Sequence, residues 1–294
     1  MKEADYPDLF QSADKAALAA QRQYVSVFFL DLVLLVGAGA FALFRSVTTG
    51  DLSWIMGIVS AVSMLASIIC KLVMRVRRFD RIWFDCRAIA ESVKTTAWRY
   101  MMCVPPFNTE KSPATSDQEL VTELESIRKA RPSVIGELAA YPSDSDRITP
   151  TMRHTRQLSL SDRKRKYLKE RLKDQKEWYR SKAKINADAA DKSFWVIIWV
   201  QTFAFVLGVV EVVKPKTPNM VAVIVSVAAI IIAWNEMKRY KDLANAYTIA
   251  ADDLASAEAV WEHIADEKEL QKQVIQTEDA ISREHTMWLV RRTS

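Results

Sequence analysis

Four apolar runs divide the chain, at roughly 24–44, 52–74, 194–213 and 219–235. A helix rises about 1.5 Å per residue, so about 20 residues cross the roughly 30 Å hydrocarbon core of a bilayer. Between the runs the chain is dense in Lys, Arg, Asp and Glu. A soluble helical bundle would mix the two kinds of residue at helical spacing, and four such runs would leave it too little polar surface. The pattern predicts an all-α membrane protein with four transmembrane helices.

Short connectors, residues 45–51 and 214–218, join these runs in pairs. Connections of this length make neighbouring helices antiparallel, so we expect two transmembrane helical hairpins. The long segment 75–193 and the residues after the fourth run carry most of the flanking basic side chains. Because positive charge beside membrane helices stays in the cytoplasm, both termini are predicted to be cytoplasmic and the tight turns external. The start of the chain lacks a basic segment and a cleavage site, so no cleaved signal peptide is expected.

The helices are expected to continue beyond the bilayer as long cytoplasmic helices. Neither Gly nor Pro occurs in residues 58–104, where apolar residues recur at helical spacing until Pro105 and Pro106. Residues 152–207 and 219–294 are also free of Gly and Pro. Apolar side chains available for packing in the last of these stretches are Trp261, Leu270, Val274, Ile281 and Trp288.

The segment between the two halves has a different composition. Residues 108–160 are rich in Ser, Thr, Pro and scattered charge, which predicts a cytoplasmic linker that is partly disordered. One short helix is expected near 117–130. The predicted domains are therefore a first hairpin with its cytoplasmic helix, 1–107, the linker, 108–160, and a second hairpin with a C-terminal helix, 161–294.

The two halves resemble each other in sequence. Arg78-Phe79 directly follows the second helix of the first hairpin, and Arg239-Tyr240 follows that of the second. At the same offset three further pairs correspond: Glu91 with Asp252, Val93 with Leu254, and Tyr100 with Trp261. The identity is low, but the elements come in the same order. We interpret the chain as an internal repeat in which both hairpins have the same orientation.

Neither the net charge nor the cysteine and histidine residues indicate a nucleic-acid site, a disulfide or a metal site. The formal net charge is +5, and the basic residues cluster beside the apolar runs, as membrane topology requires; no nucleic-acid partner is expected. The three cysteines, Cys70, Cys86 and Cys103, are scattered, which indicates reduced thiols and no disulfide framework. The three histidines, His154, His263 and His285, have no partner at metal-ligand spacing. With no phosphate-binding glycine loop and no nucleophile turn, we expect no enzyme, metal site or cofactor.

Polar residues inside the apolar runs are the first functional candidates. A carboxylate at the bilayer centre costs about 2–4 kcal/mol, so Asp31 must face a partner, water or the interface. Lys71 lies at a similar depth on the antiparallel neighbour and is a candidate partner. Such a pair either stabilises the hairpin, which we favour, or serves a pore or a sensor. Gln201 is the corresponding polar residue of the third run.

Small polar stripes are the second set of candidates. Ser60, Ser63 and Ser67 form one on the second run, and Ser226 lies between Ala222 and Ala229 on the fourth. Stripes of small residues usually pack helices together, and lining a pore is the alternative.

On the predicted cytoplasmic helix, Arg87, Glu91 and Lys94 share one face at i, i+4 and i+7. They form either a ladder of weak ion pairs or a surface for a partner, and Trp83 and Trp98 complete this candidate motif. The basic run 163–166 is interpreted as a contact with anionic lipid or as the solvated start of a long helix.

The stretch from Arg81 to Phe107 resembles the signature that follows the first hairpin in SLATT proteins, the SMODS and SLOG-associating two-transmembrane effector domains. Further similar residues of the first half are Tyr6 to Phe10, Ala13-Asp14 and Gln21-Arg22. The second half resembles another member of the group, through Trp178-Tyr179, Lys182-Ala183 and Trp195. The resemblance covers most of the chain except 108–160 and implies two tandem copies.

The resemblance implies a bacterial inner-membrane effector of conflict or antiphage systems. Family members are proposed to assemble into pores that depolarise the membrane once a nucleotide or other signal is sensed. The expected partners are therefore the lipid bilayer, further copies of the chain, and a nucleotide second messenger or a sensor protein. No catalytic residue carries over. The alternatives are a non-conducting membrane scaffold or sensor that binds partners through its cytoplasmic helices and, less favoured because no proline breaks the runs, a transporter.

Overall fold

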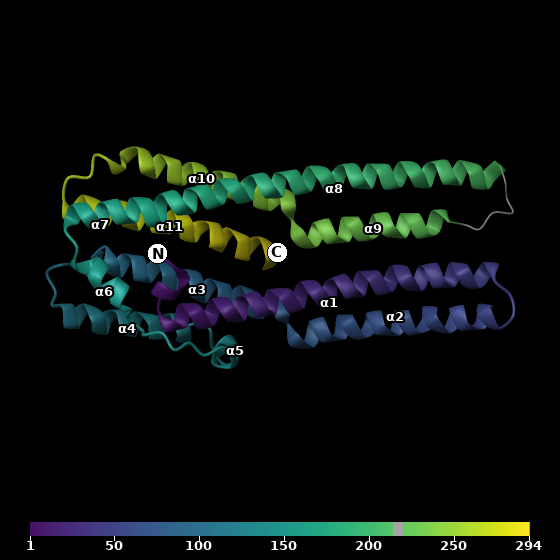
Figure 1. Ribbon diagram of the computed structural model, residues 1–294, viewed down its shortest axis with the longest axis horizontal. Helices are drawn as coiled ribbons and strands as arrows, with labels where there is room; N and C mark the ends of the chain where they lie inside the picture. Colours follow the sequence, from purple (N-terminus) through teal and green to yellow (C-terminus); the bar gives the residue numbers. More distant parts are fainter. Residues whose placement is uncertain (214–219, 294) are drawn as a thin grey trace. The chain divides into compact units, whose positions relative to one another are not determined.

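The computed structural model describes residues 1–213 and 220–293, with side chains up to residue 282 (Figure 1). In these residues the fold is helical, and four helices are long and apolar enough to cross a membrane, which confirms the predicted class. The predicted connector 214–218 and the side chains of His285 and Trp288 lie outside the described part. The helices are, in order, α1 (Asp8–Val47), α2 (Asp51–Arg77), α3 (Phe79–Met101), α4 (Pro113–Lys129), α5 (Ile135–Ala140), α6 (Pro150–Gln157), α7 (Leu160–Tyr167), α8 (Asp174–Val213), α9 (Val221–Lys238), α10 (Tyr240–Trp261) and α11 (Glu267–Thr293).

The contacts of the chain divide it into two compact units that cut across the two sequence halves. The membrane unit consists of residues 22–79 and 184–244, and the extramembrane unit of residues 1–21, 80–183 and 245–294. The membrane unit contains two hairpins, α1–α2 and α8–α9 (Figure 1). Gly50, the N-cap residue just before α2, has a φ of +63°, a conformation that favours glycine and allows the tight turn after α1.

The helices that leave the two hairpins are not continuous, which corrects the prediction for residues 58–104. Arg78 separates α2 from α3 in the left-handed conformation, with φ 49° and ψ 43°. Arg239 separates α9 from α10 with φ 52° and ψ 43°. Each arginine N–H still donates to a carbonyl of the preceding turn, of Met74 at 3.0 Å and of Asn235 at 2.7 Å. A left-handed residue thus ends each helix without Gly or Pro, at the two positions that the sequence repeat aligns.

Replacing Arg78 by glycine is expected to raise the free energy of unfolding by about 1 kcal/mol, because a left-handed non-glycine residue costs about 1–2 kcal/mol. Thermal unfolding in detergent measures the change. Arg75→Gly, within the last turn of α2, is the matched control and is expected to lower stability by about 1 kcal/mol. Equal losses in both variants would contradict a strained Arg78.

Residues 108–160 contain more regular structure than the sequence predicts. They form α4, α5 and α6 instead of one helix, and the side chains of Ser112 and Thr149 cap α4 and α6 by accepting a backbone N–H. Pro113 and Pro150 stand in the first turn of α4 and α6, where a missing N–H costs nothing. Leu120 and Met152 are fully buried. The expectation of partial disorder is therefore corrected, because a few well-spaced apolar residues tie this segment to the core.

The third membrane helix begins well before its apolar run, as predicted, because α7, a π-helical turn, η3 (Leu168–Lys173), and α8 follow one another without a gap from Leu160 to Val213. Only α6 is separated from this helix. The break after α6 has Ser159 as the cap of α7. A π turn inserts an extra residue into the helix and commonly marks a functional position.

The core of the extramembrane unit combines both halves of the sequence. The buried face of α3 includes Val93 and Trp98, neither of which is solvent-accessible. The ring of Tyr167 packs edge-on against Trp98 at 5.4 Å and stacks on Trp261 of α10 at 5.1 Å. Trp261 belongs to the second half of the repeat, so the two halves share one core.

Candidate functional site

A buried ion pair lies at the centre of the extramembrane unit. Glu278 of α11 is 0% exposed and Arg171 of the π turn is 1% exposed. Arg171 donates from Nε and Nη2 to the two carboxylate oxygens, at 2.9 and 2.7 Å. The hydroxyls of Tyr167 and Thr95 each donate to the same carboxylate at 2.8 Å. Glu278 therefore accepts four hydrogen bonds, from the π turn, α7 and α3.

The surroundings of Arg171 and Tyr167 keep both side chains protonated. Burial by itself lowers the pKa of Arg171, but the charge and hydrogen bonds of Glu278 raise it above its ordinary value, so the guanidinium stays charged. Burial, followed by the nearby charge of Glu278, raises the pKa of Tyr167 well above the ordinary value. Sequence reasoning missed Arg171 and Glu278, because nothing in their local pattern separates them from the many solvated charges around them.

The three charged residues of the predicted motif lie beside this pair. Arg87, Glu91 and Lys94 line a cavity of about 390 Å³ in the extramembrane unit, together with Arg171. Arg87 pairs with Glu91 at 2.5 Å along α3 and with Asp14 of α1 at 3.0 Å. The predicted ladder is thus present between the first two residues, but this face of α3 is turned toward α1 and is largely buried.

Lys94 occupies a different position from its two neighbours. Its ammonium lies 5.7 Å from the centre of the Tyr6 ring, a cation–π geometry. Burial lowers the pKa of Lys94, although Glu91 acts in the opposite direction. The side chain is therefore a partly desolvated cation beside an aromatic ring.

The two tryptophans of the motif differ in role. Trp98 is fully buried and donates from its indole N–H to the Tyr6 hydroxyl at 2.9 Å. Trp83 stacks on Phe84, with ring centres 5.0 Å apart, and packs at the edge of the core. Trp98 thus fixes the aromatic wall of the cavity, since Tyr6 lines it.

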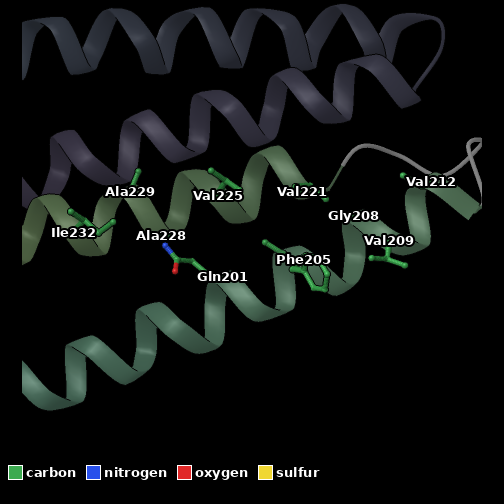
Figure 2. A pocket seen from close by; sticks show the side chains of 11 residues that line it. Gln201, Phe205, Gly208, Val209, Val212, Val221, Val225, Ala228, Ala229 and Ile232 are labelled. Carbon is green, nitrogen blue, oxygen red and sulfur yellow. The ribbon is translucent and has the colours of Figure 1, made fainter.

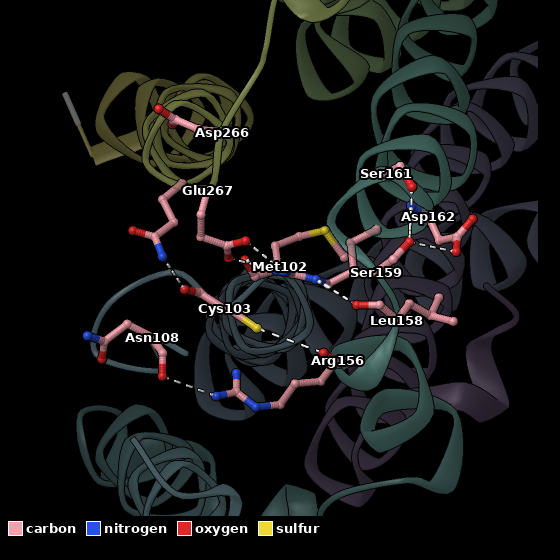
Figure 3. A network of polar contacts seen from close by, with 12 residues as sticks. Met102, Cys103, Asn108, Arg156, Leu158, Ser159, Ser161, Asp162, Asp266 and Glu267 are labelled. Atoms are coloured by element: carbon pink, nitrogen blue, oxygen red, sulfur yellow. Dashed lines mark hydrogen bonds and ion pairs between the residues drawn. The ribbon is translucent and has the colours of Figure 1, made fainter. Parts of the chain in front are cut away.

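A second polar network surrounds the end of α3 (Figure 3). Helix ends leave carbonyls without intrahelical partners, and here side chains from other elements satisfy them. Arg156 donates to the Tyr100 carbonyl at 2.7 Å, Arg163 to that of Met102 at 3.1 Å, and Gln271 to that of Cys103 at 2.9 Å.

Arg163 corrects the prediction for the basic run 163–166. It is 4% exposed and forms a two-bond ion pair with Glu267 of α11, at 2.9 and 2.7 Å. Lys164 donates to the carbonyls of Glu262 and Ile264, just after α10. Arg163 therefore joins α7 to the end of α3 and the start of α11, and Lys164 joins α7 to the segment after α10. Arg165 of the same run is exposed, as expected for the solvated start of a long helix.

The three cysteines are free and buried. Burial raises the pKa of the Cys86 thiol to about 12, so it stays protonated and unreactive at neutral pH.

In the membrane unit, Asp31 and Lys71 form an ion pair between α1 and α2. The Lys71 ammonium lies 2.7 and 2.8 Å from the carboxylate oxygens, and Ser67 donates to the same carboxylate at 2.5 Å. Asp31 is buried, whereas the Lys71 side chain is 53% exposed on the surface of the unit. Asp31 lies about 16 residues before the end of α1, or roughly 24 Å from the hairpin turn. The pair is therefore near the membrane boundary opposite the turn and not at the bilayer centre.

The remaining intramembrane candidates are dispersed. Ser60 donates to the Ala38 carbonyl of α1 at 2.8 Å, which together with Ser67 favours the packing interpretation of this stripe; Ser63 between them is half-buried. Ser226 donates to the Ala222 carbonyl of its own helix at 2.8 Å. Among the described residues, no hydrogen bond or ion pair joins Ser226 or Gln201 to the Asp31 pair.

Gln201 extends into a groove between α8 and α9 (Figure 2). The groove has a volume of about 550 Å³ and is otherwise lined by apolar and small side chains, such as Phe205, Gly208 and Ala228. Gln201 is the polar side chain of this lining, and the groove belongs entirely to the second hairpin.

Together, the paired hairpins, the four candidate spans and the repeated left-handed break define an all-α membrane protein built from two copies of a two-helix membrane domain. Residues 7–164 match the family model of the SMODS and SLOG-associating 2TM effector domain 3, and residues 167–288 match that of domain 1. The chain belongs to the SLATT family and carries two of its domains in tandem. These are membrane-linked effector domains associated with conflict and defence systems. No curated protein and no solved structure matches the chain.

Proposed function

We propose that the protein is a signal-gated, oligomeric effector that permeabilises the bacterial inner membrane in conflict or antiphage defence. The observation that carries the proposal is the tandem arrangement of two effector domains, each of which supplies a membrane hairpin. Large apolar side chains of both hairpins are exposed on the surface of the chain, among them Trp54, Val76, Trp199 and Phe205. In a bilayer such faces contact lipid or further copies of the chain.

The orientation is part of the proposal. Arg75 and Arg77 lie in the last turn of α2, and Lys238 lies in the last turn of α9. By the positive-inside rule these ends are cytoplasmic, and with them both chain termini and the extramembrane unit. The polar cavity beside the buried Arg171–Glu278 pair would then open to the cytoplasm.

The proposal includes no catalytic step, metal ion or cofactor. Its partners are the lipid bilayer, further copies of the chain, and a nucleotide second messenger or a sensor protein that delivers the signal. Nucleic acid is not among them, because the basic side chains at the helix ends are explained by membrane topology.

A non-conducting scaffold or sensor is the second candidate function. One observation favours it: the Asp31 carboxylate is satisfied by Lys71 and Ser67 within its own hairpin. An intramembrane charge that is fully paired inside one hairpin stabilises that hairpin without any conduction path.

The membrane potential separates the two candidates. The full chain is expressed in bacteria, and a voltage-sensitive dye is followed before and after phage infection, with cells carrying the empty vector as control. An effector is expected to dissipate most of the potential after infection, while uninfected cells keep theirs. An unchanged potential in the presence of correctly inserted protein, across a panel of phages, would favour the scaffold.

A further inference from the structure

The cavity beside the Arg171–Glu278 pair has the size and lining of a ligand site. Its volume of about 390 Å³ falls in the range of about 300–1,000 Å³ that is usual for small-molecule pockets. It lies between α1, α3, the π turn and the start of α8, all within the extramembrane unit. Polar and apolar atoms contribute to its lining in similar measure.

The acidic side chains of the cavity are already engaged or exposed. Glu3 and Asp174 are exposed. The other three form ion pairs: Asp14 and Glu91 with Arg87, and Glu170 with Lys166. The carboxylates that line the cavity are therefore either neutralised by cations of the chain or hydrated.

Two cations of the cavity keep hydrogen-bond donors that no side chain of the described residues uses, although Arg171 is also paired with Glu278. Arg171 is 1% exposed and uses Nε and Nη2 for Glu278, but its buried Nη1 has no hydrogen-bond partner among the described residues. A buried donor without a partner costs about 1–3 kcal/mol, more when it is charged. Lys94 makes no ion pair or hydrogen bond within the described part of the chain, and Tyr6 is its aromatic neighbour. Both cations can accept an anion without losing a partner.

Aromatic rings form the other part of the lining. Tyr6, Phe10, Trp178 and Tyr179 all line the cavity. Tyr6 is held by the hydrogen bond from Trp98, and Trp178 by an edge-on contact with the Tyr179 ring at 5.2 Å. Fixed rings beside Lys94 and the unused Nη1 donor of Arg171 are suited to a flat ligand that carries a negative charge.

We infer that this cavity binds a small aromatic anion, in which a planar ring carries one phosphate or carboxylate group. The acid group contacts Lys94 and Nη1 of Arg171, and the ring packs against Tyr6 and Trp178. Binding of such a ligand does not depend on the proposed function. Only the consequence that the ligand is the activating signal rests on that function.

The test uses the purified full chain in detergent and isothermal titration calorimetry. Phenyl phosphate and benzoate are the two probes, inorganic phosphate tests the acid without a ring, and benzyl alcohol tests the ring without an acid. We expect at least one probe to bind ten or more times as tightly as inorganic phosphate and benzyl alcohol. If phenyl phosphate binds more tightly, the natural ligand carries a phosphate group. If benzoate binds more tightly, the natural ligand carries a carboxylate group.

Lys94→Met and Trp178→Leu are each expected to weaken the binding of the better probe at least tenfold. Lys15→Met, which changes an exposed lysine of α1 outside the cavity, is the matched control and should bind as the wild type does. Melting temperatures show that each variant is folded. No binding of either probe by folded protein, equal binding of inorganic phosphate, or unchanged binding by Lys94→Met would overturn the inference. Because binding is measured without a membrane potential, a protein that binds but never depolarises cells refutes the proposed function alone.

Discussion

Replacing Glu278 by alanine is expected to destabilise the protein by about 3–5 kcal/mol, since it leaves the Arg171 charge buried without a partner. The same change removes the acceptor of the Tyr167 and Thr95 hydroxyls. Both effects act in the core shared by the two halves, so the whole extramembrane unit should lose stability. Thermal or denaturant unfolding in detergent, followed by circular dichroism, measures the loss.

The adjacent residue gives a matched control. Asp279 pairs with Arg99, but its side chain is 57% exposed, so Asp279→Ala should cost about 1 kcal/mol or less. The double variant Arg171→Met/Glu278→Leu removes both charges and should recover much of the loss, because apolar residues of similar size often replace a buried pair without penalty. If Glu278→Ala were no more harmful than Asp279→Ala, the pair would not be buried as described.

Replacing Asp31 by leucine is expected to destabilise the membrane unit by about 1–2 kcal/mol, because Lys71 would lose its counter-charge near the membrane boundary, where an unpaired charge costs less than the roughly 2–4 kcal/mol at the bilayer centre. Unfolding of the detergent-solubilised protein measures this change. Lys71 is half exposed and lies near the membrane boundary, so part of the loss is relieved when its ammonium reaches the interface.

The double variant Asp31→Leu/Lys71→Leu should restore stability, and Asp51→Asn at the start of α2, where the carboxylate is exposed, should leave it unchanged. The same variants separate the roles of the pair. If the pair only stabilises the hairpin, the double variant depolarises cells as the wild type does. If it belongs to a conduction path, the double variant is stable but ion flux changes. A single variant as stable as the wild type would show that the pair does not stabilise the hairpin.

The two halves of the repeat share their helix breaks and buried aromatic positions, but they do not share the charged cavity. Arg78 and Arg239 occupy equivalent left-handed positions, and Tyr100 and Trp261 are both buried at the matching offset. The charged face of α3 is not repeated, since Arg87 and Lys94 correspond to Thr248 and Ala255 in α10. The cavity is therefore a feature of the first copy, completed by Arg171 and Trp178 at the start of the second.

Local composition was sufficient for the membrane architecture. The four apolar runs and their short connectors predicted the hairpins, because a bilayer imposes a fixed length and an apolar surface on any helix that crosses it. The pairing of Asp31 with Lys71 could also be anticipated, since an antiparallel hairpin with a short turn fixes which residues lie at the same depth. The composition of residues 108–160 led to a wrong prediction of a partly disordered linker, because Pro and Ser in this segment stand at helix starts.

The sequence by itself thus determined the class of protein, its spans and its repeat, all of which follow from periodicity and solvation along a single stretch of chain. Only the tertiary structure decided the site. Glu278 contacts Arg171, which is 107 residues away in the sequence, and Thr95, which is 183 residues away. A charge pattern along the chain does not predict contacts between residues so far apart. The same limit applies to the helix breaks at Arg78 and Arg239, because a left-handed arginine is stable only where the surrounding fold holds it.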